Sequence, residues 1–233
     1  MKLAAERAAE LLALARRLGH DFKALELLDR ALTHTSRANE AGPDVRHNEP
    51  FEFLGDAVLG FVVADLLHRR NPEGDEGTKS RIRAHLVAEP SLAQRAQALG
   101  LPELLLLGRG EEKTGGRRKV ALWADAYEAV VAALYLDGGT DAARRFIEKD
   151  FGGEVDAGPQ DAIVDHKSAL QELLQSRGQA VPEYVVVEES GPSHRRRFRV
   201  ECRIAGHAVS SGEGSSKKEA QQESARRALD LLR

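Results

Sequence analysis

The sequence predicts two domains of different fold class, an all-α domain over residues 1–151 and a smaller α+β domain over residues 161–233. Three observations lead to this prediction. Apolar residues recur at helical spacing through the first part of the chain, and strand-like alternation appears only near its end. Between the two parts, residues 152–160 (GGEVDAGPQ) contain few apolar residues and four helix breakers, which predicts a flexible linker.

The first domain is expected to be a succession of helices. Near the N-terminus, Leu11, Leu14 and Leu18 recur at helical spacing, and Gly19 is a typical helix stop. Helical periodicity then continues to about Phe151, interrupted by short polar or Gly-rich loops.

The second domain is expected to follow the order α-β-β-β-α, a compact two-layer unit. Asp165 can cap a first helix that Gly178 ends. Ser216 and Glu219 form a capping box at the start of a last helix. Three stretches with β-branched, aromatic or alternating residues predict the strands: residues 184–187, 197–204 and 208–211.

Composition and charge exclude several classes of protein. The 34 Lys and Arg residues against 37 Asp and Glu residues give a net charge of −3, so any basic surface has to be local. The single cysteine, Cys202, excludes an internal disulfide framework and a cysteine-rich zinc site. No apolar run approaches the roughly 20 residues of a membrane span, and the charged N-terminal residues are unlike a signal peptide. We therefore expect a cytoplasmic protein with no membrane partner.

Two pairs of acidic residues lie within strongly apolar helical segments. Glu52 and Asp56 are four residues apart, and Asp125 and Glu128 are three apart, so each pair shares one helix face. A single such pair is usually a solvated face. If the two apolar helices pack together, however, four carboxylates meet in one partly desolvated site and their repulsion favours a bound cation. Oxygen ligands without His or Cys favour Mg²⁺ or Mn²⁺.

Other conspicuous residues favour structural interpretations. His34 has no Ser or Cys partner in evidence and is expected to be a hydrogen-bonded structural residue, while Trp123 and Tyr127 are expected to pack in the core. For the Gly-rich basic loop 108–119, two interpretations stay open: contact with phosphates through residues 117–119, or a solvated helix connection.

The segment Asn48 to Leu59 (NEPFEFLGDAVL) resembles the signature of the ribonuclease III family. The resemblance continues in four further segments: ALTH (31–34), EGTKSR (76–81), GRGEEKTGGRRK (108–119) and the stretch 124–139 with ADAYEA and LYLDGG. The α-β-β-β-α unit is similar to a double-stranded RNA-binding domain at residues 171–172 (QE), 191–194 (GPSH) and 217–218 (KK). Together these segments span nearly the whole chain.

The resemblance implies a Mg²⁺-dependent endoribonuclease, with Mn²⁺ as a substitute ion, that hydrolyses double-stranded RNA and leaves 5′-phosphate and 3′-hydroxyl ends. Glu52, Asp125 and Glu128 match the family's magnesium ligands, while Asp56 and Glu128 match its two most critical catalytic positions. Two further acidic positions line the family's site: Glu49 and Glu76. No small-molecule cofactor is implied.

The resemblance also implies how duplex RNA binds. Matches to positions that meet 2′-hydroxyl groups in the minor groove are Gln171, Glu172, Ser193 and His194. Lys217 and Lys218, in the first turn of the last helix, suit phosphate groups, and basic residues also gather at 194–199. Recognition is expected to follow RNA shape rather than base sequence.

The resemblance implies a homodimer whose two nuclease domains share one RNA-binding valley. Phe51, Phe53 and Leu54 either supply part of that interface or are buried within the subunit. By family, the substrates are ribosomal RNA precursors, some messenger and transfer RNA precursors, and antisense duplexes.

The sequence departs from the family pattern at Pro50, Val120 and Ala121. Proline disfavours helical geometry at the preceding residue, which predicts Glu49 as a cap or pre-helix residue. Two other functions compete: a catalytically silent double-stranded RNA-binding protein, and a hydrolase of small phosphate esters. The four intact carboxylates argue against a catalytically silent protein. A hydrolase of small phosphate esters would leave the C-terminal α+β domain unexplained.

Overall fold

Two compact units make up the chain in the computed structural model, one from Met1 to Gln160 and the other from Asp161 to Arg233. The structure describes residues 3–157, 166–192 and 196–232. Across these ranges, no helix combines the length and the apolar character that crossing a membrane requires.

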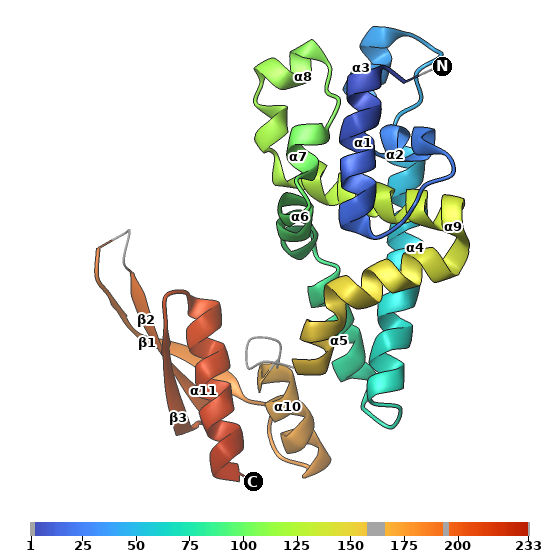
Figure 1. Cartoon of the computed structure of the whole chain (residues 1–233). Coiled ribbons are helices and arrows are strands. Elements are labelled where there is room, and N and C mark those ends of the chain that lie inside the picture. The colour runs from blue at the N-terminus through green and yellow to red at the C-terminus, as the bar shows by residue number, and fades with distance from the viewer. Residues whose placement is uncertain (1–2, 158–165, 193–195, 233) are drawn as a thin grey trace. The chain divides into compact units, whose positions relative to one another are not determined.

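The first unit is built of helices, as its periodicity predicts (Figure 1). The predicted N-terminal helix is confirmed, since Leu11, Leu14 and Leu18 are buried and Gly19 ends the helix in a left-handed conformation. Apart from one isolated bridge, the described residues of this unit form no strand, so the all-α prediction is confirmed. The segments are α1 (Ala5–Leu18), α2 (Leu25–Ala31), α3 (Thr35–Ala41), α4 (Glu49–Arg70), α5 (Glu76–Leu86), α6 (Glu89–Ala98), α7 (Leu101–Leu104), α8 (Arg109–Lys113), the 3-10 turn η1 (Gly116–Arg118) and α9 (Val120–Ala157).

Helix α9 is bent sharply at Gly139, where φ is 70° and ψ is −171°. A side chain would make this backbone conformation unfavourable, which explains the glycine. The bend, visible in Figure 1, turns the second half of α9 back along the first. As a result, the ring of Tyr127 packs against Phe146 and Phe151, with ring centroids 5.8 and 6.3 Å away.

The predicted linker over residues 152–160 is wrong at its start, because α9 continues through Gly152 and Gly153 to Ala157. Two glycines cost a helix about 1 kcal/mol each. Phe151 and Val155, one turn apart, are both buried and hold this last stretch of helix in place. Residues 158–160 lie outside the described part of the chain.

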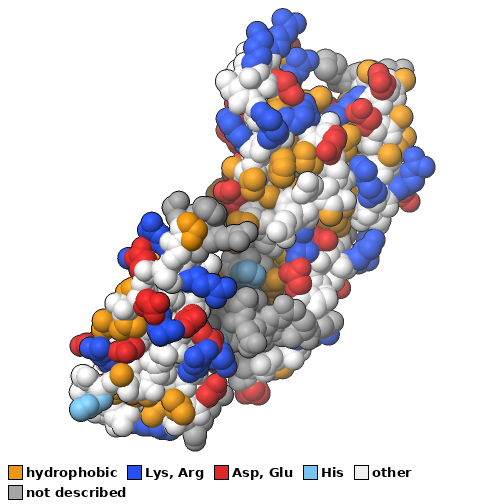
Figure 2. Space-filling view, turned by 90° about the vertical axis from the view of Figure 1, so that its left-hand side faces the viewer, with side chains coloured by type: hydrophobic (Ala, Val, Ile, Leu, Met, Phe, Trp, Pro, Cys, Tyr) orange, Lys and Arg blue, Asp and Glu red, His pale blue; other side chains and the backbone are white. Residues whose placement is uncertain are grey.

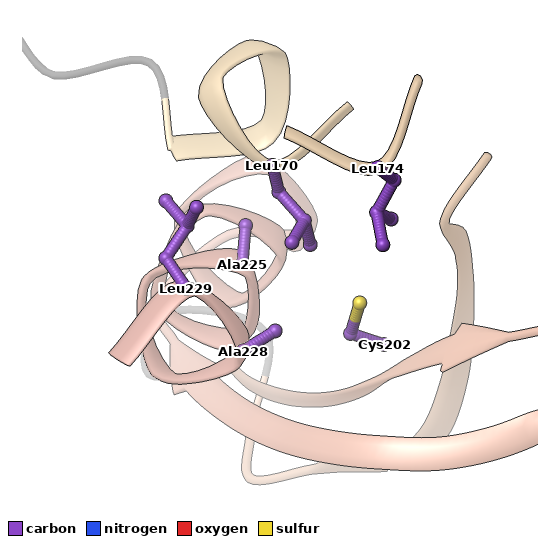
Figure 3. Close-up of a cluster of buried hydrophobic side chains, with 6 residues drawn as sticks. All are labelled: Leu170, Leu174, Cys202, Ala225, Ala228 and Leu229. Atoms are coloured by element: carbon purple, nitrogen blue, oxygen red, sulfur yellow. The ribbon is translucent and has the colours of Figure 1, made fainter. Parts of the chain in front are cut away.

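The second unit has the predicted α-β-β-β-α order, so the α+β prediction is also confirmed. Its three strands are antiparallel and lie in the sheet in the order in which they follow along the chain, and both helices lie on one face of the sheet (Figure 1). In Figure 3, Leu170 and Leu174 of the first helix point toward Cys202 of the central strand, which is buried as expected. The elements are α10 (His166–Ser176), β1 (Glu183–Ser190), β2 (Arg197–Ile204), β3 (His207–Gly214) and α11 (Lys217–Leu232).

The capping box at the start of α11 forms one of its two bonds with Ser215 instead of Ser216. The Ser216 hydroxyl accepts the N–H of Glu219 at 3.1 Å, as predicted, but the Glu219 carboxylate accepts the N–H of Ser215, at 2.7 Å. Both bonds satisfy amides at the helix start. The other predicted cap, Asp165, lies outside the described residues.

Candidate active site

Helices α4 and α9 cross at the two acidic pairs. Gly55 is the point of closest approach, because a Cβ atom built on it would lie 1.9 Å from the carbonyl oxygen of Glu128. Only a residue without a side chain allows the two backbones to come so near. The crossing therefore brings Glu52 and Asp56 of α4 beside Asp125 and Glu128 of α9.

The charges of these side chains influence one another across the crossing. Burial, followed by the charges of Asp56, Glu52 and Asp125, raises the pKa of Glu128 to about 8. Burial and the charge of Glu52 raise the pKa of Asp125 to about 6. Burial also raises the pKa of Glu52. The carboxylates thus occupy a partly desolvated site in which negative charge is costly.

The chemistry of this site suits a hard divalent cation. All four side chains offer oxygen donors, and Glu128 keeps its proton at neutral pH unless a cation replaces it. Among the described residues, no three His, Cys, Asp or Glu side chains stand close enough to hold a metal ion as they are. Carboxylates repel one another when no cation lies between them, so an ion would have to draw these side chains together.

The two accessory acids predicted from the sequence lie in different surroundings. Glu49 is the first residue of α4, not a cap or pre-helix residue, because the helix already starts with amides bonding to the Asn48 carbonyl. Its carboxylate lies 3.7 Å from Nδ1 of His47 and contributes to the raised pKa of Glu52. Glu76 is exposed at the start of α5, where it accepts a hydrogen bond from the Ser80 hydroxyl at 2.9 Å.

A further acidic residue, Glu89, was not found from the sequence. It is the first residue of α6 and, after burial and Glu52, its charge raises the pKa of Asp125. The sequence did hold a weak signal, because Glu89-Pro90 repeats the pair Glu49-Pro50 at another helix start.

A buried network supports the part of α9 that carries the acids. Tyr127, next to Glu128, is fully buried as expected, and its hydroxyl donates to Asp150 at 2.5 Å. Arg95 of α6 donates to the Asp150 carbonyl at 2.6 Å and stacks 3.7 Å above the ring of Phe151. These contacts join α6 to both halves of α9 and limit rotation of the segment that bears Glu128.

The basic loop 108–119 is largely occupied by internal contacts. The Arg117 guanidinium bonds to the Glu112 carboxylate and to the carbonyls of Pro102 and Leu105, at 2.7 to 3.1 Å. Lys119 pairs with Glu111 at 2.7 Å. For these two cations the structure therefore favours a helix connection over a phosphate site.

His34 has the structural role predicted for it. It precedes α3, where its ring Nδ1 lies 2.8 Å from the Ser36 hydroxyl and accepts the Ser36 N–H. Trp123 is half-buried, and its indole N–H donates to the Arg117 carbonyl at 2.8 Å.

The described RNA-contact residues of the second unit lie on its two helices. Gln171 and Glu172 are exposed on α10, and Lys217 and Lys218 are exposed in the first turn of α11. Ser193 and His194 lie outside the described residues. The face of the protein in Figure 2 shows cations and anions interspersed over its surface.

The expected basic cluster at residues 194–199 is partly neutralised. Arg196 pairs with Glu189 at 2.9 Å, and Arg199 pairs with Glu213 at 2.9 Å and with Glu188 at 3.4 Å. Antiparallel pairing of β2 with both neighbours places Glu188 and Glu213 directly opposite Arg199. These two cations are therefore less available to RNA than the sequence suggested.

Two family models match the chain in the order expected from its sequence. Residues 25–154 match a ribonuclease-III-like model, and residues 166–232 match the double-stranded RNA binding motif.

Similar proteins and structures agree with these matches. The chain is 50% identical to ribonuclease 3 of Symbiobacterium thermophilum, over 92% of this chain and 91% of that protein. It is 44% identical to ribonuclease 3 of Geobacillus kaustophilus, over 98% of this chain and 93% of that protein. A structure of the ribonuclease III nuclease domain from Campylobacter jejuni, with a flexible region involved in dimer formation, matches 60% of this chain and 96% of that chain (TM-score 0.54, 39% identity).

Proposed function

Because the chain belongs to the ribonuclease III family of endonucleases, we propose that it hydrolyses phosphodiester bonds in double-stranded RNA, leaving 5′-phosphate and 3′-hydroxyl ends. The observation that carries this proposal is the crossing of α4 and α9, where burial and the charges of three other carboxylates raise the pKa of Glu128 to about 8. We assign the nuclease to the first unit, which includes α9 to its end at Ala157, and RNA binding to residues 161–233.

Each core carboxylate has a proposed role. Glu52, Asp125 and Glu128 would hold Mg²⁺, or Mn²⁺ in its place. When bound, the ion activates the attacking water and neutralises charge on the scissile phosphate. Glu128 would give up its proton in order to hold the cation. Asp56 is exposed at the same crossing, so its carboxylate can accept a hydrogen bond from the water and orient it.

The accessory acids act from the edge of the site. Glu49 adds negative charge beside Glu52, and its effect on the pKa of Glu52 supports this role. Glu76 is proposed as an accessory acid on the family match alone.

Duplex RNA binds to the second unit through Gln171, Glu172, Ser193 and His194 in the minor groove. Lys217 and Lys218 bind phosphate groups at the start of α11, where exposed amide groups add to the positive potential. Groove width and 2′-hydroxyl groups decide recognition, because side chains cannot read bases in the deep major groove of A-form RNA.

Two copies of the chain form the active dimer through α4. Phe53 and Phe61 are two turns apart on this helix and are 82% and 58% exposed, which is unusual for phenylalanine. Phe51 is buried within the subunit, beneath the Arg30 guanidinium at 4.4 Å, and Leu54 is half-buried. Phe53, one turn from Asp56, is thus the residue of the predicted trio that suits an interface.

The natural substrates are proposed to be ribosomal RNA precursors, some messenger and transfer RNA precursors, and antisense duplexes. We place the protein in the cytoplasm, where these RNAs occur. The lone buried Cys202 is compatible with a reducing compartment.

The decisive experiment is cleavage of an end-labelled RNA duplex with Mg²⁺, with EDTA and with the Glu128→Gln protein. Metal-dependent products with 5′-phosphate ends, absent from the variant, are expected. Duplex binding should survive the substitution, because Glu128 belongs to the first unit. Tight binding without cleavage under any divalent metal would instead establish the competing function, a catalytically silent double-stranded RNA-binding protein.

A further inference from the structure

A cavity of about 330 Å³ opens in the second unit where α10, β1 and α11 meet. Gln171 and Lys218 belong to the RNA-contact set proposed above, whereas the other lining residues have no assigned role. The lining contains two lysines and no carboxylate, which favours an anionic ligand. The residues are Lys167, Ser168, Gln171, Tyr184, Lys218 and Gln222.

Lys167 is held in place by neutral groups. Its Nζ donates to the side-chain oxygen of Gln221 at 2.7 Å and lies 4.7 Å from the centre of the Tyr184 ring. An amide oxygen and an aromatic face orient an ammonium group without cancelling its charge. One of its three donor hydrogens is used by Gln221. The side chain is therefore ordered before a ligand arrives, which lowers the entropy cost of binding.

Three arginines of this unit differ from Lys167 because each forms an ion pair with a carboxylate. Arg203 pairs with Glu201 at 2.8 Å, and Arg226 and Arg227 both pair with Glu223 at 2.7 to 2.9 Å. Neither lysine of the cavity forms an ion pair with a carboxylate of the described residues. The positive charge of the two cavity lysines is therefore not cancelled by a carboxylate in the part of the chain that the structure describes, unlike that of these three arginines.

We propose that this cavity binds a backbone phosphate of duplex RNA, with Lys167 and Lys218 as its two cationic donors. The inference rests on the proposed function and adds Lys167 to the RNA-binding residues. Cations from two different helices would fix the position of one phosphate relative to both, which a single flexible lysine cannot do. Lys167 and Gln171 are also one turn apart on α10, so a phosphate contact and a minor-groove contact follow the same helix face.

The test measures binding of the full chain to an RNA duplex of about 16 base pairs, in EDTA to prevent cleavage and over a range of KCl concentrations. Lys167→Gln is compared with Arg203→Gln, a matched control that removes the same charge from the sheet. Lys167→Arg, which keeps the charge, separates loss of the cation from damage to the cavity. Thermal unfolding of each variant confirms that it is folded.

We expect Lys167→Gln to weaken binding about ten-fold at moderate salt and to lower the salt slope by about 1. Arg203→Gln should leave the slope unchanged, and Lys167→Arg should restore most of it. An unchanged slope in folded Lys167→Gln protein would overturn this inference while leaving the proposed function intact. Failure of the unsubstituted chain to bind the duplex would count against the proposed function itself.

Discussion

Replacing Gly55 with alanine tests whether the helix crossing builds the catalytic site. The added Cβ would lie 1.9 Å from the carbonyl oxygen of Glu128, 2.5 Å from its carbonyl carbon and 3.1 Å from its Cα. A carbon and an oxygen normally stay about 3.3 Å apart or more. Because all three atoms are backbone, no side chain can swing away. Helix α4 must therefore move from α9 by more than about 1 Å.

The expected cost has two parts. Overpacking a core costs about 1–3 kcal/mol, and a gap of this width forfeits a quarter to a half of the dispersion energy of the atoms that separate. Alanine returns up to about 1 kcal/mol through its higher helix propensity. We expect a net loss of about 2–3 kcal/mol in the free energy of unfolding. Since Glu52 and Asp56 move with α4, cleavage should fall at least about 100-fold, as catalytic groups misplaced by about 1 Å typically do.

Chemical denaturation followed by circular dichroism measures the first quantity, and cleavage of the RNA duplex below the unfolding transition measures the second. Gly60→Ala is the matched stability control, because it lies on the same helix and an added Cβ would meet nothing within 4 Å. That variant should be unchanged or slightly more stable. The reasoning is refuted if Gly55→Ala is as stable as Gly60→Ala, or if it cleaves RNA at the unsubstituted rate.

Three further predictions concern charge and assembly. Because the pKa of Glu128 is raised to about 8, the folded protein binds this proton more tightly than the unfolded chain. In EDTA, the unsubstituted protein should gain stability relative to Glu128→Gln as pH falls from above 8 toward 4.5. A shift of this size corresponds to at most about 5 kcal/mol, reduced by solvent screening to about 2 kcal/mol, and a difference that does not change with pH would contradict the assignment. Replacing Lys217 and Lys218 with alanine should lower the salt slope of duplex binding by about 2, whereas an equal slope would argue against phosphate contacts. Phe53→Ser with Phe61→Ser should shift sedimentation toward the monomer, and a monomer already present without substitution would count against the proposed dimer.

Much of the architecture could be predicted from the sequence because it is locally encoded. Helical periodicity, the alternation of residues 197–204 and the stop at Gly19 reflect interactions within a few residues, and the structure contains the corresponding elements. The acid pairs could be assigned to helix faces for the same reason. Their placement within apolar helices also predicted that the two helices would pack together, and α4 does pack on α9.

What the sequence could not supply depends on contacts between distant segments. The linker prediction failed because burial of Phe151 and Val155 outweighs the local effect of two glycines. The sequence could not show that the Arg117 guanidinium is used within the fold, where it donates to the carbonyls of Pro102 and Leu105. The effect of the Glu89 charge on the pKa of Asp125 likewise depends on the packing of α6 beside α9, which the sequence does not reveal.

The sequence by itself determined which chemical groups the protein has and on which kind of element each stands. Tertiary structure alone decided their distances and their effective charges. Gly55 illustrates the difference. In the sequence it is one glycine within a helix, and only the structure shows that the Glu128 backbone leaves no room for a side chain there. Lys167 and Arg203 likewise carry the same formal charge, yet only Arg203 has a carboxylate partner. The physical reason is that periodicity is a property of neighbouring residues, whereas desolvation and charge pairing depend on whatever the rest of the chain brings near.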